Sequence, residues 1–155
     1  MVISQSIQKY MEIAIEEARL ACANGEVPIG AVLVNSMTGK VFAKSGNRVE
    51  RDFDPTAHAE LIVIRRAAAL LSKVRLNDFD LYVTLEPCPM CAGAISLARL
   101  RRVYFGAYDI KGGGIENGPR IFHQSTCTHR PEIYGGIRES DSAQLLRNFF
   151  LQRRS

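Results

Sequence analysis

The feature that most constrains this chain is a set of metal-ligand side chains divided between two short motifs. One is His-Ala-Glu at residues 58–60, and the other is Pro-Cys-Pro-Met-Cys at residues 87–91, one predicted helix and one predicted strand later. Together they offer His58, Cys88 and Cys91 as ligands for one Zn²⁺, so the fold must bring two distant segments together. Structural zinc normally has four protein ligands, whereas three leave one tetrahedral position for water. The motifs therefore predict a catalytic zinc site.

Both motifs are predicted to begin helices. Pro89 suits the first position of a helix, which makes Cys88 the cap residue and places Cys91 on the same first turn. Free backbone N–H groups and the positive helix end favour thiolates there. His58 would begin the helix that carries Glu60, so this carboxylate can lie beside the water without being a ligand. That placement suits a general acid/base.

Other interpretations of these residues are less specific. A Cys-x-x-Cys pair alone is also typical of redox sites and of half a structural zinc site, and a lone His-x-Glu carries little information. The main competitor for a fourth ligand is Cys127, which is followed by His129. This pair could be a second metal-binding element, but a surface loop is the favoured interpretation because no second partner pair is visible.

The composition fits one enzyme domain over residues 1–155. With 46% hydrophobic residues in 155, the chain can bury a full core. Two of the four cysteines belong to the motif, so no disulfide framework is expected and a cytoplasmic location is the default. The N-terminus does not resemble a signal peptide, and no apolar run approaches membrane-spanning length, so no membrane partner is expected.

The charge favours a polyanionic partner, although weakly. The formal net charge is +4 and the sequence pI is near 9.0. Basic residues cluster at 99–102 and at 147–154, and each cluster is equally well explained as a solvated helix end. Phe149 and Phe150 could stack on bases, but their helical spacing predicts that at least one lies in the core.

Helices and strands are predicted to alternate along the chain. Helices are expected from residue 7 to about 24, at 58–71, 88–100 and 140–153, and strands at 30–34, 40–45, 80–85, 102–107 and 132–137, with a loop over 111–130. The closing helix should turn Ala143, Leu146, Phe149 and Phe150 inward. This β-α-β-α-β succession predicts an α/β fold, with both motifs at helix starts where open α/β sheets usually carry active sites.

Longer strings extend the pattern beyond the two motifs. They are Glu-Val-Pro-Ile-Gly-Ala-Val at 26–32, Asn-Arg at 47–48, Asp-Pro-Thr-Ala-His-Ala-Glu at 54–60, Tyr-Val-Thr-Leu-Glu-Pro-Cys-Pro-Met-Cys-Ala-Gly-Ala at 82–94, Arg-Val-Tyr-Phe-Gly-Ala at 102–107 and Phe-Phe-Leu-Gln-Arg-Arg at 149–154. His-x-Glu with Pro-Cys-x-x-Cys is the established signature of zinc deaminases, of the cytidine-deaminase-like superfamily. The longer strings resemble the bacterial tRNA-specific adenosine deaminases over most of the chain.

That resemblance implies a fold and an activity. The fold is a three-layer α/β/α arrangement with a mixed five-stranded sheet, in a homodimer with one zinc ion per subunit. The activity is hydrolytic conversion of adenosine to inosine at the wobble position of a tRNA anticodon, of an arginine tRNA, in the cytoplasm. In this family Glu60 would be the general acid/base, and His58, Cys88 and Cys91 the zinc ligands.

The resemblance also implies substrate contacts. Asn47 would hydrogen-bond the purine, and the backbone at Ala59 and Glu86 would hold the reacting oxygen and the exocyclic amine. The remaining positions are Val27, Pro28 and Ile29 lining the base pocket, Asp109 beside the flanking nucleotides, and Lys111, Phe150, Arg153 and Arg154 as candidate RNA contacts. Tyr108 departs from the family, in which an arginine can precede the aspartate, so phosphate contacts at this position are less expected.

Two other functions share parts of this pattern. A free-base guanine or cytosine deaminase has the same zinc signature, and it would act on the free base without RNA. A non-catalytic RNA-binding subunit of deaminase fold is disfavoured because Glu60 is intact.

Overall fold

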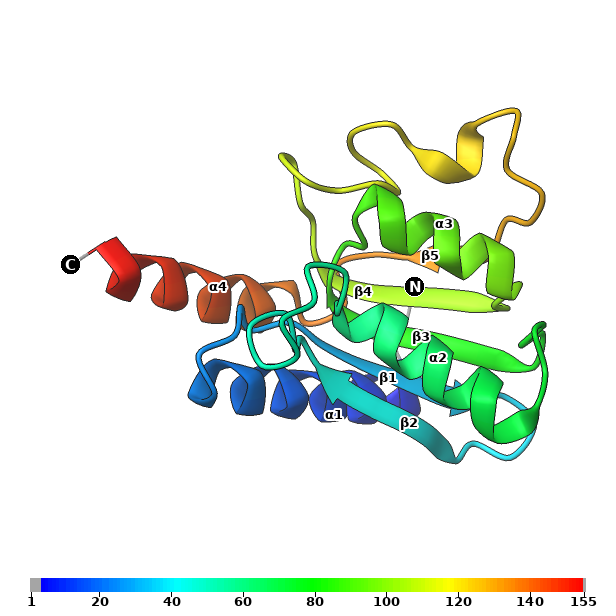
Figure 1. The fold of residues 1–155 in the computed structure, drawn as a ribbon, viewed down its shortest axis with the longest axis horizontal. Coiled ribbons are helices and arrows are strands. Elements are labelled where there is room, and N and C mark those ends of the chain that lie inside the picture. Colours follow the sequence, from blue (N-terminus) through cyan, green and yellow to red (C-terminus); the bar gives the residue numbers. More distant parts are fainter. Residues whose placement is uncertain (1–3, 155) are drawn as a thin grey trace.

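The computed structural model describes residues 4–154, with the side chain of Arg154 outside the described part, and its strands form one mixed sheet in the order β2-β1-β3-β4-β5 (Figure 1). The elements are α1 (Gln5–Ala23), β1 (Gly30–Asn35), β2 (Val41–Gly46), α2 (Ala59–Leu71), β3 (Phe79–Leu85), α3 (Pro89–Ala98), β4 (Arg102–Ala107), the 3-10 helix η1 (Ile121–His123), β5 (Glu132–Tyr134) and α4 (Glu139–Arg154). Strand β1 runs antiparallel to β2 and β3, whereas β3, β4 and β5 are parallel.

Alternating side chains of the central strands fill two separate cores. In β1, Leu33 packs into one core and Val32 into the other, and in β4 Phe105 and Tyr104 divide in the same way. This alternation follows from the two-residue period of a strand, which points successive side chains to opposite faces. Both faces of the sheet are therefore apolar and need a helical cover.

Two helices cover each face. Buried side chains of α2 and α3 join the first core, and Met11, Ala14 and Ile15 of α1 join the second, against which Leu145 of α4 also packs. In Figure 1, α2 and α3 lie in front of the sheet, and α4 extends beyond its edge. The predicted three-layer α/β/α fold with a mixed five-stranded sheet is confirmed.

The strand directions bring the two metal-ligand motifs and several of the longer strings to one edge of the sheet. Strands β3 and β4 end side by side, where Leu85 pairs with Ala107. Because β1 is antiparallel, its first residue lies at the same edge, and the Gly30 N–H donates to Thr84 Oγ1 over 3.1 Å. Segments 26–29, 47–60, 86–91 and 108–117 all leave the sheet from this edge or reach it. The sheet topology thus gathers residues that are far apart in the sequence.

The structure corrects three details of the sequence prediction. Strand β5 ends at Tyr134, short of residue 137, because Gly136 turns the chain with a φ of +80°. The 111–130 loop contains η1, whose Phe122 is buried in the core. Phe149 is buried as expected, but Phe150 is 48% exposed and does not face inward. Among residues 4–154, no helix combines the length and the apolar character that crossing a membrane requires.

Candidate metal centre and active site

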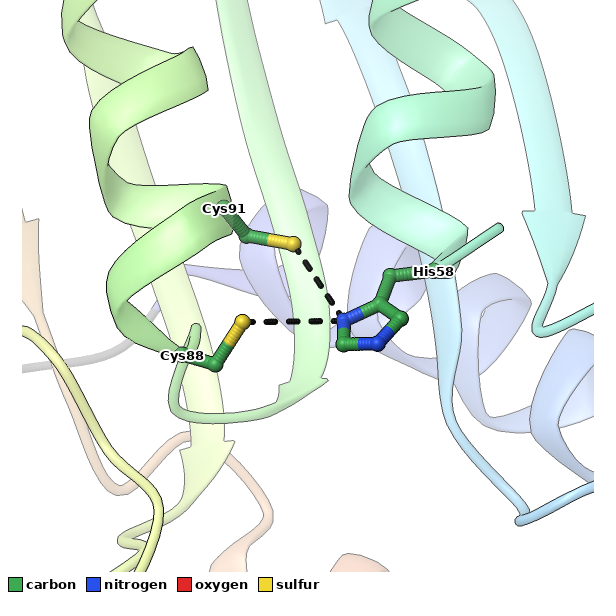
Figure 2. Close-up of side chains that lie close together, drawn as sticks. All are labelled: His58, Cys88 and Cys91. Atoms are coloured by element: carbon green, nitrogen blue, oxygen red, sulfur yellow. Dashed lines mark hydrogen bonds between the residues drawn. The ribbon is translucent and has the colours of Figure 1, made fainter. Parts of the chain in front are cut away.

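His58, Cys88 and Cys91 form one cluster at the starts of two neighbouring helices. His58 is the N-cap residue of α2 and Cys88 that of α3, with Pro89 in the first helical turn as predicted. Figure 2 shows the three side chains pointing toward one another, with His58 Nδ1 3.6 Å from Cys88 Sγ and 3.5 Å from Cys91 Sγ. A tetrahedral zinc with its usual bond lengths separates nitrogen from sulfur by about 3.5 Å. The cluster therefore fits this metal.

Hydrogen bonding inside the cluster prepares a thiolate. The pKa of Cys88 is lowered to about 4, chiefly because the Cys91 thiol donates a hydrogen bond to it, and His58 acts in the same direction. The same bond raises the pKa of Cys91, and the bond to Cys88 raises the pKa of His58. A thiolate is the form that binds zinc, so one ligand is ready at neutral pH before the metal arrives.

Glu60 lies beside the cluster on the first turn of α2. Its side chain is buried, with 4% exposed. Burial raises its pKa to about 7, because a carboxylate loses its hydration there. A divalent cation on the neighbouring ligands opposes this rise by favouring the carboxylate. A carboxyl group with a pKa near neutrality can both accept and donate a proton under physiological conditions.

A cleft of about 310 Å³ opens next to His58. Val27, Ile29 and Asn47, three of the residues expected to contact the base, line it. Pro28, the third residue expected in this stretch, is buried and is not among the lining residues. Residues 49, 50 and 55, from the segment before α2, form another part of the wall.

The backbone N–H groups of Ala59 and Glu86 both have partners within the chain. The Ala59 N–H donates to Asn47 Oδ1 over 2.9 Å, and the Glu86 N–H donates to the Ala107 carbonyl over 2.8 Å. Asn47 therefore fixes the start of α2, and its side-chain amide N–H groups are what it can offer a ligand. The Ala59 N–H group is therefore engaged in this arrangement, whereas the contact expected between Glu86 and the exocyclic amine would use the Glu86 carbonyl oxygen, because an amine donates.

A second cavity of about 560 Å³ adjoins the first through Val27, which lines both. It brings together Asp109, Lys111 and Phe150, three of the candidate RNA contacts. Arg147 of α4 completes a positively charged side of the cavity. The prediction that Phe150 lies in the core was wrong. Its exposed ring lies where a base could stack.

The end of α4 reaches the first cleft. Arg153 lines that cleft and donates from Nη2 to the Gly25 carbonyl over 2.9 Å. Its guanidinium also lies 4.5 Å from the centre of the Phe149 ring, which holds it in place. The side chain of Arg154, the other candidate in this segment, lies outside the described residues.

The second basic cluster lies away from this edge. Arg101 forms two hydrogen bonds with Asp80, and Arg102 pairs with Glu132 over 2.9 Å. These residues sit at the starts of β3, β4 and β5, whereas the metal cluster follows the end of β3. Their ion pairs and their distance from the metal cluster both indicate that these arginines are solvated surface residues and not RNA contacts.

Cys127 and His129 are not part of the metal cluster. Among the described residues, the group able to hold a metal is His58, Cys88 and Cys91, whose ligand atoms lie within 4.8 Å of one another. Cys127 Sγ instead lies 3.1 Å from the His129 carbonyl, and His129 Nε2 lies 2.7 Å from the Leu100 carbonyl. These contacts tie the 111–130 loop to the end of α3.

We expect Cys127→Ser to keep full zinc content and near-wild-type turnover, because this side chain contacts the loop, Ser96 and the core and is not part of the metal cluster. Inductively coupled plasma mass spectrometry of the purified protein measures the zinc. Loss of metal in this variant would make Cys127 a ligand after all.

The structure also reveals a side chain whose role the sequence did not suggest. Glu86 was expected to act through its backbone, yet its carboxylate is buried and accepts several hydrogen bonds from the segment 109–117. Burial tends to raise its pKa, but the hydrogen bonds from Asp109 and Asn117 outweigh burial and hold the pKa below its usual value. A Glu before Pro-Cys gave no sequence signal for this role, because most of its donors are backbone groups.

The chain is similar in sequence to known deaminases. Residues 4–107 match the protein family described as the cytidine and deoxycytidylate deaminase zinc-binding region. The chain is 57% identical over 145 residues to the tRNA-specific adenosine deaminase of Agrobacterium fabrum, with 94% of each chain covered.

Two solved structures are similar to this chain. One, from a study of A-to-I editing by tRNA:A34 deaminases at the wobble position of transfer RNA, is 56% identical, with a TM-score of 0.86 and coverage of 89% of this chain and 99% of that one. A guanine deaminase from Nitrosomonas europaea superposes with a TM-score of 0.80 over 96% of this chain and 86% of its own, at 21% identity. The second likeness concerns the fold alone.

Proposed function

Because this chain belongs to the tRNA-specific adenosine deaminases, within the cytidine and deoxycytidylate deaminase family, we propose that it converts adenosine to inosine at the wobble position of an arginine tRNA. The protein is a zinc-dependent enzyme that deaminates adenosine in tRNA. The identity of the tRNA and the use of its anticodon stem-loop as the binding unit are the proposed parts. The deamination chemistry is supported chiefly by the cluster of His58, Cys88 and Cys91, with Glu60 buried beside it.

In this proposal His58, Cys88 and Cys91 hold the metal. Zinc, when bound, supplies a Lewis acid that lowers the pKa of a water ligand from about 16 toward about 7, so hydroxide is available at neutral pH. The start of α3 supports the ligands, because its free N–H groups and positive end favour the two thiolates.

Glu60 carries the proton transfers. Its carboxylate takes a proton from the attacking water and passes it to N1 of the adenine as the water oxygen bonds to C6. The same carboxyl group then takes the second proton and delivers it to the amino group. The C6–N bond breaks, and the products are inosine and ammonia. Its burial beside the cluster supports this role because bulk water does not compete for the proton.

The base is held by the first cleft. Val27 and Ile29 offer apolar contacts to its faces. Since Asn47 Oδ1 accepts from Ala59, the amide N–H groups of Asn47 are assigned to a purine acceptor. The second cavity, with Asp109, Lys111 and Phe150, is assigned to the nucleotides that flank the target, whose bases are splayed in a single-stranded loop.

The family also motivates two further parts of the proposal. We expect a homodimer, which size-exclusion chromatography with light scattering would detect as twice the mass of one 17.2 kDa chain. We place the enzyme in the cytoplasm, where its tRNA substrate is used. A single chain mass at micromolar concentration would contradict the dimer.

The direct test is incubation of the zinc-loaded protein with an arginine tRNA transcript that has adenosine at the wobble position. Sequencing reads inosine as guanosine, and we expect it at that position alone. The matched control is the same transcript with guanosine there. If inosine formed in a different tRNA with adenosine at the wobble position but not in the arginine tRNA, the arginine assignment would be refuted. Ammonia release from free guanine or cytosine, without any from tRNA, would instead favour the free-base alternative.

The position of Arg153 leads to a prediction about RNA binding. We expect Arg153→Glu to weaken tRNA binding about tenfold at low salt, with a shallower dependence of the dissociation constant on salt, because one phosphate contact is lost. Filter binding across a salt series measures both quantities. Arg75→Glu is the matched control, since it makes the same charge change at an exposed residue between α2 and β3. Equal losses in the two variants would remove Arg153 from the RNA-binding surface.

A further inference from the structure

The segment 109–117 is wrapped around the carboxylate of Glu86. Oε1 accepts from the Asp109 N–H over 3.1 Å and from Asn117 Nδ2 over 2.7 Å. Oε2 accepts from the N–H groups of Ile115, Glu116 and Asn117 over 3.1, 2.9 and 3.0 Å. Glu86 is 2% exposed, so nearly all the hydration that this charge loses on burial is replaced by one loop.

These bonds require an acceptor-only group. Both carboxylate oxygens face donors, and four of the five donors are backbone N–H groups that cannot reverse their role. A glutamine in the same place would turn its own N–H₂ group toward such donors, which leaves buried groups unpaired. The chemistry of the loop therefore specifies a glutamate at position 86.

The same loop touches the metal-binding end of α3. The Gly114 N–H donates to the Pro87 carbonyl over 2.8 Å. A Cβ at Gly114 would lie 2.6 Å from Pro89 N and 2.8 Å from the carbonyl carbon of Cys88, closer than side chains tolerate. The loop backbone is thus packed directly against a zinc ligand, and only glycine allows this approach.

The other end of the loop forms a wall of the second cavity. Asp109, Lys111 and Gly112 line that cavity, and the Gly112 N–H donates to Asp109 Oδ1 over 2.9 Å. The Glu86 carboxylate therefore binds both Asp109, which lines the second cavity, and residues 115–117, which follow the Gly114 backbone packed against Cys88.

We infer that Glu86 is a positioning residue for the RNA substrate: its carboxylate anchors loop 109–117, so that the wall holding the flanking nucleotides keeps a fixed place relative to the metal centre. This inference rests on the proposed function, because the wall matters only if the cavity takes up RNA. The hydrogen bonds of the Glu86 carboxylate all run to the loop, so we assign its effect to the position of the loop.

The test compares Glu86→Gln with wild type by steady-state inosine formation, zinc content and amide hydrogen exchange. We expect one zinc per chain, a raised KM for tRNA and a kcat/KM lowered about tenfold or more, with a smaller change in kcat. Exchange of the amides in 109–117 should accelerate about tenfold or more, while α2 and α3 keep wild-type protection. Asn117→Ala, which removes one bond to Oε1, should change KM and exchange in the same direction by less.

Glu132→Gln is the matched control, because it neutralises an exposed carboxylate paired with Arg102 at the other end of the sheet. Wild-type KM in Glu86→Gln, or a loss of activity that only follows the lost zinc or folded fraction, would overturn the inference. Unaltered exchange of 109–117 would overturn it as well. If the wild-type protein makes no inosine, the proposed function fails, and the exchange comparison still decides whether Glu86 anchors the loop.

Discussion

Glu60→Gln is expected to keep its zinc and lose turnover by about 10³-fold or more, the range typical of a lost general acid/base. The substitution preserves side-chain volume, so the start of α2 and the His58 ligand should stay in place. It removes the group that takes and returns protons, because an amide does neither near neutral pH. Single-turnover inosine formation on saturating tRNA measures the effect, since binding then no longer limits the rate.

Two comparisons make this result specific to Glu60. Glu16→Gln changes an exposed carboxylate on α1 and should leave the rate and the zinc content unchanged. Binding of tRNA to Glu60→Gln should also be near wild type, because glutamine keeps the volume of this buried side chain and the residues that line the cleft are unchanged. Near-wild-type turnover with zinc present would show that another group carries the proton.

Much of this site could be predicted because its signals are local in the sequence. Pro89 at a helix start and a cysteine on each side of it determine where two ligands must lie on α3. Near-continuous apolar runs such as those of β1 and β4 are typical of strands buried on both faces, and the order of strands and helices predicts an α/β sheet. The parallel ends of β3 and β4 place their following loops together. Each of these arguments needs only neighbouring residues and general geometry.

The parts that were missed depend on contacts between distant segments. The carboxylate of Glu86 binds backbone N–H groups of residues 109–117, and backbone donors leave no mark in a residue pattern. Phe150 has the helical spacing of a core residue, yet α4 extends past the sheet and leaves this side chain 48% exposed. Helical period predicts which residues share a face, but the packing partner decides whether that face is buried.

Cys88→Ala is expected to lose the metal along with activity. Two of the three ligands remain, and the one removed is the thiol whose pKa is lowered to about 4 by the hydrogen bond from Cys91. Zinc per chain should fall from about one to below about a tenth after dialysis against a chelator, because two ligands bind this metal weakly. The Cys127→Ser protein, prepared in parallel, is the matched control for loss of a cysteine.

Metal dependence of thermal stability separates this variant from Glu60→Gln. If zinc is present at a thousand times its dissociation constant, binding stabilises the native state by about 4 kcal/mol. A chain of this size then melts roughly 10 °C higher with zinc than after chelation. Wild type and Glu60→Gln should both show that difference, whereas Cys88→Ala should melt at one temperature in both conditions. An equal zinc-dependent rise in Cys88→Ala would mean that the metal is held elsewhere, and the assignment of the cluster would be wrong.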